Sequence, residues 1–132
     1  LYIRVYFNQS LMIWNIANDT LVQEWQNATG CGENSRTGSY YDGYFYSREW
    51  SAPFSRMDVA NGQVTATAIT PSEGHTATDV NPATGDIFIG PYEPTGTVFQ
   101  VYNVPSNTLV DRAPLPVSVS NHSTVVFVPN PQ

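Results

Sequence analysis

The sequence predicts an all-β protein, and three observations support this fold class. Aromatic residues are frequent, with eight Tyr, six Phe and three Trp among 132 residues, and such side chains pack well on the pleated surface of a sheet. Ten Pro and nine Gly provide the turns between short strands. Apolar residues rarely follow the 3.6-residue period of a helix, so no long helix is expected. At this length residues 1–132 are expected to form a single domain.

An internal repeat of about 44 residues organises the chain. Three segments align with spacings of 43 and 45 residues, and each predicts a β-hairpin: 14–21, 57–64 and 102–109. Their turns are rich in Asn, Asp, Gly, Pro and Ser. Gly, Asn and Asp tolerate positive φ, Asn, Asp and Ser hydrogen-bond nearby backbone, and the fixed φ of Pro also suits turns. One further strand precedes each hairpin (2–7, 44–50 and 86–92) and another follows it (39–41, 75–80 and 123–128).

Four short strands in about 44 residues predict three propeller-like blades, with approximate units 1–41, 42–83 and 84–132. In such a blade a twisted four-stranded sheet packs face to face on its neighbours. A β-sandwich is the alternative, because it also uses short strands and frequent turns, but it does not account for the repeat.

The third unit has a distinctive order of motifs. A strand runs into Gly90, a hairpin turn ends in Asn107-Thr108, Leu115-Pro116 follows, and His122 precedes the last strand. In this order the unit resembles a kelch-type blade. The Gly-Gly doublet of that family is absent here, since Pro91 follows Gly90. The resemblance implies a β-propeller repeat protein.

Some secreted copper-radical oxidases use kelch-type propellers, and their sites need two Tyr, two His and a Cys cross-linked to a Tyr. This chain contains Cys31, His75 and His122, without the Tyr-His pattern of that family. We interpret both histidines as strand-edge residues and Cys31 as an ordinary thiol. The sequence therefore predicts no catalytic residue, metal ligand or cofactor, and an enzyme fragment is kept as an alternative.

Two predicted strands of the first unit each carry a charged residue: Arg4 lies in residues 3–7 and Glu24 in residues 21–25. These strands are similar to the Arg-containing and Glu-containing strands of the six-bladed fucose-binding lectins of fungi and bacteria. The resemblance implies that Arg4 and Glu24 hydrogen-bond sugar hydroxyls while an aromatic ring such as Trp25 stacks on the sugar. The gap between Arg4 and Glu24 is several residues longer than in that family.

The segment 40–50 combines aromatic and charged side chains and is a second candidate binding surface. Tyr44, Tyr46, Arg48 and Trp50 are its candidate ligand-binding residues, because aromatic faces and Arg anchor sugars or protein partners. With the period of two of a strand, Tyr44, Tyr46 and Arg48 share one face. Packing of these rings in the core is the competing interpretation.

The charge balance excludes some partners. Five Arg and no Lys oppose eleven acidic residues, which gives a net charge of −6 and no basic patch for phosphates. Nucleic acid is therefore not an expected partner. Membrane insertion is not expected either, because no apolar run approaches the roughly 18–20 residues of a membrane span.

Four Asn-x-Ser/Thr triplets predict N-glycosylation and a secreted or cell-surface location. They begin at Asn8, Asn18, Asn27 and Asn121. The leading hypothesis is a non-catalytic binding or scaffold module of an extracellular glycoprotein that binds a glycan or a protein, and a lectin is the second. Three blades do not close a propeller. We therefore expect a homo-oligomer or the remainder of a longer parent chain.

Overall fold

The computed structural model describes residues 2–5, 10–26, 38–48, 53–71, 78–90, 100–111 and 128. This part of the chain is built from strands: β1 (Tyr2–Val5), β2 (Ser10–Asn15), β3 (Thr20–Trp25), β4 (Gly38–Tyr41), β5 (Tyr44–Arg48), β6 (Phe54–Asp58), β7 (Val64–Ala66), β8 (Thr78–Asn81), β9 (Asp86–Ile89), β10 (Gln100–Asn103) and β11 (Thr108–Asp111). The described residues contain no helix long and apolar enough to cross a membrane.

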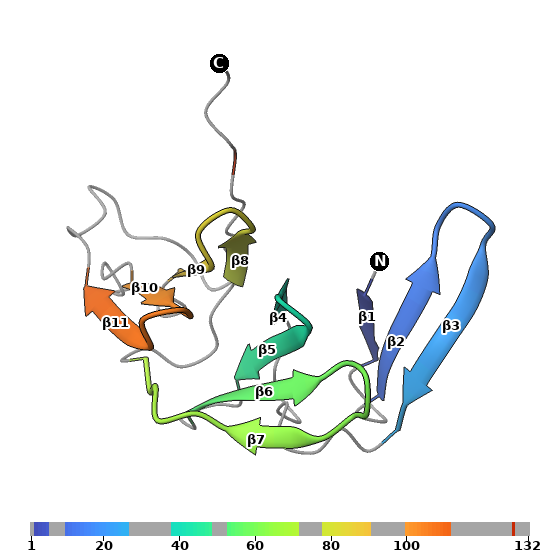
Figure 1. The fold of residues 1–132 in the computed structure, drawn as a ribbon, viewed down its shortest axis with the longest axis horizontal. Helices are drawn as coiled ribbons and strands as arrows, with labels where there is room; N and C mark the ends of the chain where they lie inside the picture. The colour runs from blue at the N-terminus through green and yellow to red at the C-terminus, as the bar shows by residue number, and fades with distance from the viewer. Residues whose placement is uncertain are drawn as a thin grey trace.

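The strands form three antiparallel sheets in which each strand pairs with the next along the chain. The first sheet has the order β1-β2-β3, the second β4-β5-β6-β7 and the third β8-β9-β10-β11. They stand side by side with the second sheet in the middle (Figure 1). The predicted all-β fold of propeller-like blades is confirmed, and three stacked sheets exclude the two-layer sandwich.

The sheets begin one strand earlier than the sequence units. β4, which ends the first unit, pairs with β5, and β8, which ends the second unit, pairs with β9. The last strand predicted in each of these units therefore belongs to the sheet of the following unit. The corresponding strand predicted at 123–128 lies outside the described residues except for Val128.

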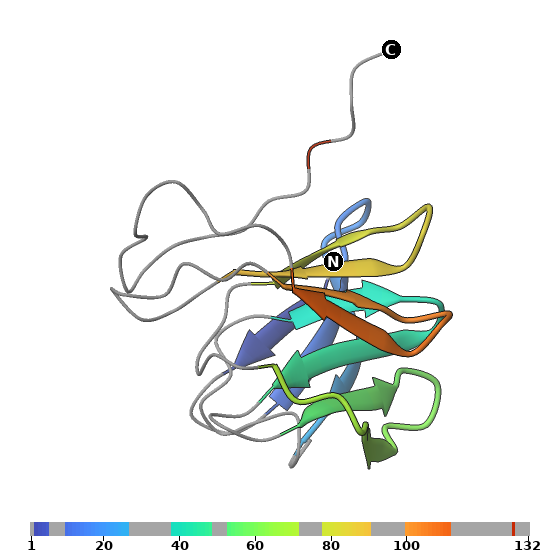
Figure 2. The same cartoon turned by 90° about the vertical axis from the view of Figure 1, so that its left-hand side faces the viewer.

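Four hairpin turns share one local design. The residue before each four-residue turn accepts a hydrogen bond on its side-chain oxygen from a backbone N–H inside the turn: Asn15, Asp58, Asn81 and Asn103. The last turn residue has a φ between 53° and 74°: Asp19, Gly62, Gly85 and Asn107. Asn and Asp suit the first position because their side chains accept hydrogen bonds, and Gly, Asn and Asp suit the last because they tolerate positive φ. The aligned hairpins of the repeat are therefore confirmed. The turns that end in Gly62, Gly85 and Asn107 lie on the same side of the molecule (Figure 2).

The second sheet is buried on both faces. Phe45 and Met57 pack with Leu11 of the first sheet in one core cluster. On the opposite face, Tyr46 and Phe54 pack with a second cluster from the third sheet, made of Ile87, Ile89 and Tyr102. Phe45 and Tyr46 are neighbours in β5, so the alternation of side chains along one strand supplies two separate cores.

The second and third sheets meet along their first strands. The Ser39 hydroxyl in β4 donates a hydrogen bond of 3.2 Å to the Thr78 hydroxyl in β8. The later strands of the two sheets spread apart (Figure 1). A pocket lies between the two sheets in this region, lined by residues of β6, β7 and β10 and of the segments that follow β7 and β10.

We predict that Gly62→Ala destabilises the fold more than Gly43→Ala does. Both glycines have positive φ, which costs an L-residue about 1–2 kcal/mol. A Cβ at Gly62 also lies 2.5 Å from the Trp25 indole, whereas a Cβ at Gly43 meets nothing within 4 Å. Overpacking adds about 1–3 kcal/mol to the loss at Gly62. Urea unfolding measures both variants, and equal losses would show that Trp25 does not constrain this turn.

Candidate binding site in the groove between two sheets

Arg56 projects from the middle of β6 towards the third sheet. Its strand neighbours Ser55 and Met57 are buried, whereas Arg56 is exposed. In the ladders of the second sheet Arg56 lies opposite Tyr46 of β5 and Thr65 of β7. Directly paired residues share a face of the sheet, so these three side chains lie on the side of the second core.

Tyrosine side chains hold the Arg56 guanidinium. Its Cζ lies 4.9 Å from the centroid of the Tyr44 ring, a cation–π arrangement. Its positive charge also acts on the Tyr46 phenol, whose pKa it lowers. Tyr46 in turn packs edge-on against Tyr102 of the third sheet, with ring centroids 6.2 Å apart, and Tyr102 stacks on Phe54 at 5.9 Å. The tyrosines beside the arginine are thus packed against a ring of the third sheet.

Burial keeps the two central phenols neutral. Desolvation raises the pKa of Tyr46, and the neighbouring Tyr102 raises it further, while the charge and hydrogen bond of Arg56 act in the opposite direction. Desolvation also raises the pKa of Tyr102, and Arg56 again opposes the shift. Both phenols therefore stay protonated at neutral pH, and the charge of Arg56 is not neutralised by a phenolate.

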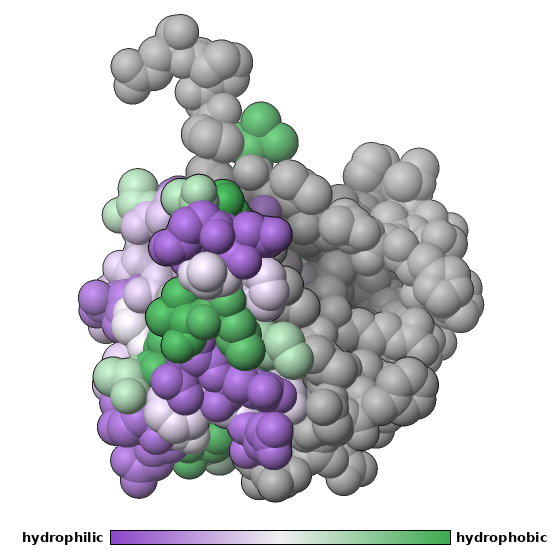
Figure 3. All heavy atoms as spheres, turned by 90° about the vertical axis from the view of Figure 1, so that its right-hand side faces the viewer, coloured by the Kyte–Doolittle hydropathy of each residue, from purple (hydrophilic) through white to green (hydrophobic). Residues whose placement is uncertain are grey.

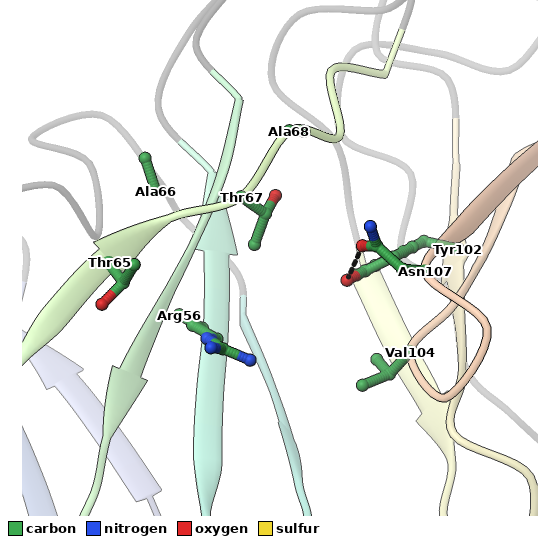
Figure 4. A pocket seen from close by; sticks show the side chains of 8 residues that line it. All are labelled: Arg56, Thr65, Ala66, Thr67, Ala68, Tyr102, Val104 and Asn107. Carbon is green, nitrogen blue, oxygen red and sulfur yellow. Dashed lines mark hydrogen bonds between the residues drawn. The ribbon is translucent and has the colours of Figure 1, made fainter.

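A groove of about 270 Å³ opens beside Arg56. Its second-sheet wall consists of Arg56, Thr65, Ala66, Thr67 and Ala68, and its third-sheet wall consists of Tyr102, Val104 and Asn107 (Figure 4). We call this space the Arg56 groove. A charged side chain, hydroxyl groups and an amide meet here in one hollow between two sheets.

The structure brings some of the predicted binding residues together and separates others. Tyr44 and Tyr46 lie on one face of β5, as the period of two predicts, and their ring centroids are 6.4 Å apart. Glu24 and Trp25 belong to the first sheet and, as neighbours in β3, face opposite sides. Trp25 packs against the first core, and its indole N–H donates to the Val59 carbonyl at 3.3 Å.

Other predicted residues lie partly or wholly outside the described part of the chain. Arg4 pairs with Leu11 and Arg48 with Phe54 through the backbone, but their side chains are not described. Trp50, Cys31, His75 and His122 lie outside the described residues, as do Asn8, Asn27 and Asn121. Within the described residues, no group of three or more His, Cys, Asp or Glu is placed to hold a metal ion. The binding roles of Arg4, Glu24, Trp25, Arg48 and Trp50 stay predictions.

Sequence reasoning missed Arg56, although the repeat carries a signal for it. The residue before each aligned hairpin is Ile13, Arg56 and Val101. A single Arg at a position that is otherwise aliphatic marks a side chain with a task other than core packing. The sequence carried no comparable sign that Asn107 lines a site, because an Asn at the end of this turn is already explained by its positive φ.

No protein-family model and no curated protein matches the sequence. The structure is similar to the crystal structure of the WD40 repeats of RRP9, with a TM-score of 0.60 and 14% sequence identity. The match covers 83% of this chain and 33% of that chain. This chain is a β-propeller-like repeat protein. The likeness concerns the propeller-like fold alone, and this chain spans about a third of the length of that propeller.

We predict that the propeller-like fold loses stability at alkaline pH through Tyr46 and Tyr102. Unfolded phenols titrate near pH 10, whereas burial raises the pKa of both folded ones. Above pH 10 the unfolded state therefore releases protons that the folded state retains, so the free energy of unfolding falls as pH rises.

Urea unfolding of Tyr46→Phe between about pH 8 and 11 tests this linkage. The variant should show a shallower alkaline loss than the wild type. Tyr40→Phe, which removes a hydroxyl from a residue that is 40% exposed, is the control. A slope for Tyr46→Phe as steep as that of the wild type would contradict the assignment.

Proposed function

We propose that the chain is a non-catalytic binding or scaffold module whose ligand site is the Arg56 groove. The observation that carries this proposal is the exposed guanidinium held over Tyr44 and against Tyr46 at the mouth of a hollow. A free arginine side chain loses rotamer freedom when it binds a ligand. Here the tyrosine contacts already restrict the side chain, so less entropy is lost on binding.

A lectin is the second candidate function, and burial of the rings weakens it. A sugar stacks on an accessible aromatic face, but Tyr46 is only 2% exposed and Arg56 covers one face of Tyr44. Trp25 packs against the first core. A sugar at the Arg56 groove would therefore depend on polar contacts rather than on ring stacking.

The finer kelch-type assignment and the enzyme alternative remain proposals. The hairpin with Asn107-Thr108 supports the kelch likeness through its turn, in which Asn107 has a φ of 53°. The same turn design recurs at Asp19 and Gly62, so it characterises the repeat as a whole rather than one propeller family. A secreted enzyme such as a copper-radical oxidase would need Cys31, His75 and His122, which lie outside the described residues.

We also propose an extracellular glycoprotein, and the environment of Asn18 supports this. Asn18 is exposed in the turn between β2 and β3. The hydroxyl of Thr20, the third residue of its triplet, donates a 2.7 Å hydrogen bond to the Asn18 side-chain oxygen. The acceptor amide and the hydroxyl of the triplet are therefore adjacent and open to solvent.

Assembly into a homo-oligomer or a longer parent chain also remains a proposal. The β2–β3 hairpin exposes three apolar residues, Ile16, Leu21 and Val22, with exposed fractions of 74%, 46% and 59%. Figure 3, which views the molecule from this side, shows an apolar area bordered by hydrophilic side chains. Exposed apolar surface of this kind often marks an interaction site. A further blade packed here would cover these residues, and this supports the proposal.

We predict N-glycosylation at Asn18 when the protein is made in a secretory eukaryotic host. Peptide mass mapping after enzymatic deglycosylation should show conversion of Asn18 to Asp. Thr20→Ala removes the acceptor triplet and should abolish the conversion. An unmodified Asn18 in secreted wild-type protein would contradict the proposal.

The binding function is tested by probing peptide and glycan arrays with the labelled 132-residue chain. At least one class of ligand should retain the wild type, and Arg56→Gln should reduce this signal by about ten-fold or more, because a hydrogen bond to a charged group is lost. Gln63→Glu changes the net charge by the same amount at an exposed residue just after the turn and should leave the signal unchanged. Silence on both arrays, or equal signals for Arg56→Gln and wild type, would refute the function.

A further inference from the structure

We propose that the Arg56 groove binds the carboxylate of an acidic side chain, Asp or Glu, presented by a protein partner. This inference rests on the proposed binding function and adds the chemistry of the ligand. It follows from the donors that line the groove, from the charge of the site and from its size.

The groove offers hydrogen-bond donors and no acidic group among its lining residues. The Asn107 side-chain oxygen accepts the Tyr102 phenol at 3.1 Å, which leaves the Asn107 amide NH₂ as a donor. The Thr67 hydroxyl oxygen accepts the Ile69 N–H at 3.2 Å, which leaves the hydroxyl hydrogen to donate. With the Arg56 guanidinium, these groups present donors from both walls of the groove to an acceptor-only ligand (Figure 4).

The charge of the site fits a single negative charge. Arg56 supplies one positive charge, and its planar fork matches the two oxygens of a carboxylate. A phosphate monoester carries nearly two negative charges at neutral pH. One arginine in a protein with a net charge of −6 leaves much of that charge uncompensated. A carboxylate is therefore favoured over a phosphate.

The size and walls of the groove fit an amino-acid side chain. Its volume of about 270 Å³ lies below the roughly 300–1,000 Å³ of pockets that enclose whole small molecules. Ala66, Ala68 and Val104 contribute methyl groups, which suit the aliphatic stem of Asp or Glu. An oligosaccharide would gain little here, because Tyr102 is only 3% exposed and offers no open ring face.

Labelled pentapeptides with a central Glu, Gln, Asp or Asn between apolar residues test the proposal. Fluorescence anisotropy with the full 132-residue chain measures the dissociation constants. The Glu or Asp peptide should bind about ten-fold or more tightly than its amide counterpart, because only the carboxylate makes charge-assisted hydrogen bonds with Arg56. Arg56→Gln should remove this preference, and Arg56→Lys should retain only part of it. Gln63→Glu should keep it.

A second pair of variants keeps the test valid if Arg56→Gln does not fold. Thr67→Asp places a carboxylate in the groove without altering Arg56, retains an acceptor for the Ile69 N–H, and should abolish binding of the acidic peptides. Thr70→Asp is the control, because Thr70 is exposed, is not a lining residue and receives the same charge. Unfolding curves followed by tryptophan fluorescence establish that each variant is folded.

The outcomes separate this inference from the proposed function. Equal affinities for acidic and amide peptides, or Thr67→Asp binding as well as Thr70→Asp, would overturn the inference. Binding of an oligosaccharide of uronic acids, but of none of the peptides, in an Arg56-dependent manner would overturn the protein partner while the binding function stands. Absence of any ligand on the arrays refutes the function itself.

Discussion

The structure depends on the burial of the second sheet on both faces. In β5 and β6 successive side chains alternate between two neighbours: Phe45 and Met57 face the first sheet, and Tyr46 and Phe54 face the third. Each of these four side chains is at most 5% exposed. At about 25 cal/mol per Å² of buried apolar surface, such residues dominate the stabilisation of a small β domain. Loss of either face would leave the middle sheet without half of its core.

The Arg56 groove is a by-product of this packing. The second and third sheets meet at Ser39 and Thr78 and then spread, so large rings fill the narrow part and a hollow remains in the wide part. The rings that close the core also adjoin the arginine, since Tyr46 packs between Tyr102 and Tyr44 and Arg56 lies over the Tyr44 ring. Under the proposed function, stability and recognition share side chains, and substitutions of the tyrosines are expected to affect both. Arg56 is exposed, so its substitution is expected to change the groove more than the core.

The turns link local sequence to this arrangement. An Asx residue before the turn and a positive φ at its end fix the geometry of each hairpin, and that geometry sets the register of the following strand. In the third sheet, Asn107 ends such a turn and also accepts the hydrogen bond of Tyr102. Asn107, whose positive φ suits the end of the turn, therefore also forms part of one wall of the groove.

The sequence by itself determined the strands, the hairpins and the repeat, because a side-chain period of two and the conformational preferences of Asn, Asp and Gly act over a few neighbouring residues. It also placed Tyr44 and Tyr46 on one face of β5, since alternation is a property of a single strand. Only the tertiary structure decided which sheet each face meets and which strand begins each sheet. It likewise decided that Arg56, Thr67 and Asn107 line one hollow, because their proximity depends on how two sheets stack and spread. That relation is set by the sum of many packing contacts between residues distant in the chain, and no local pattern encodes it.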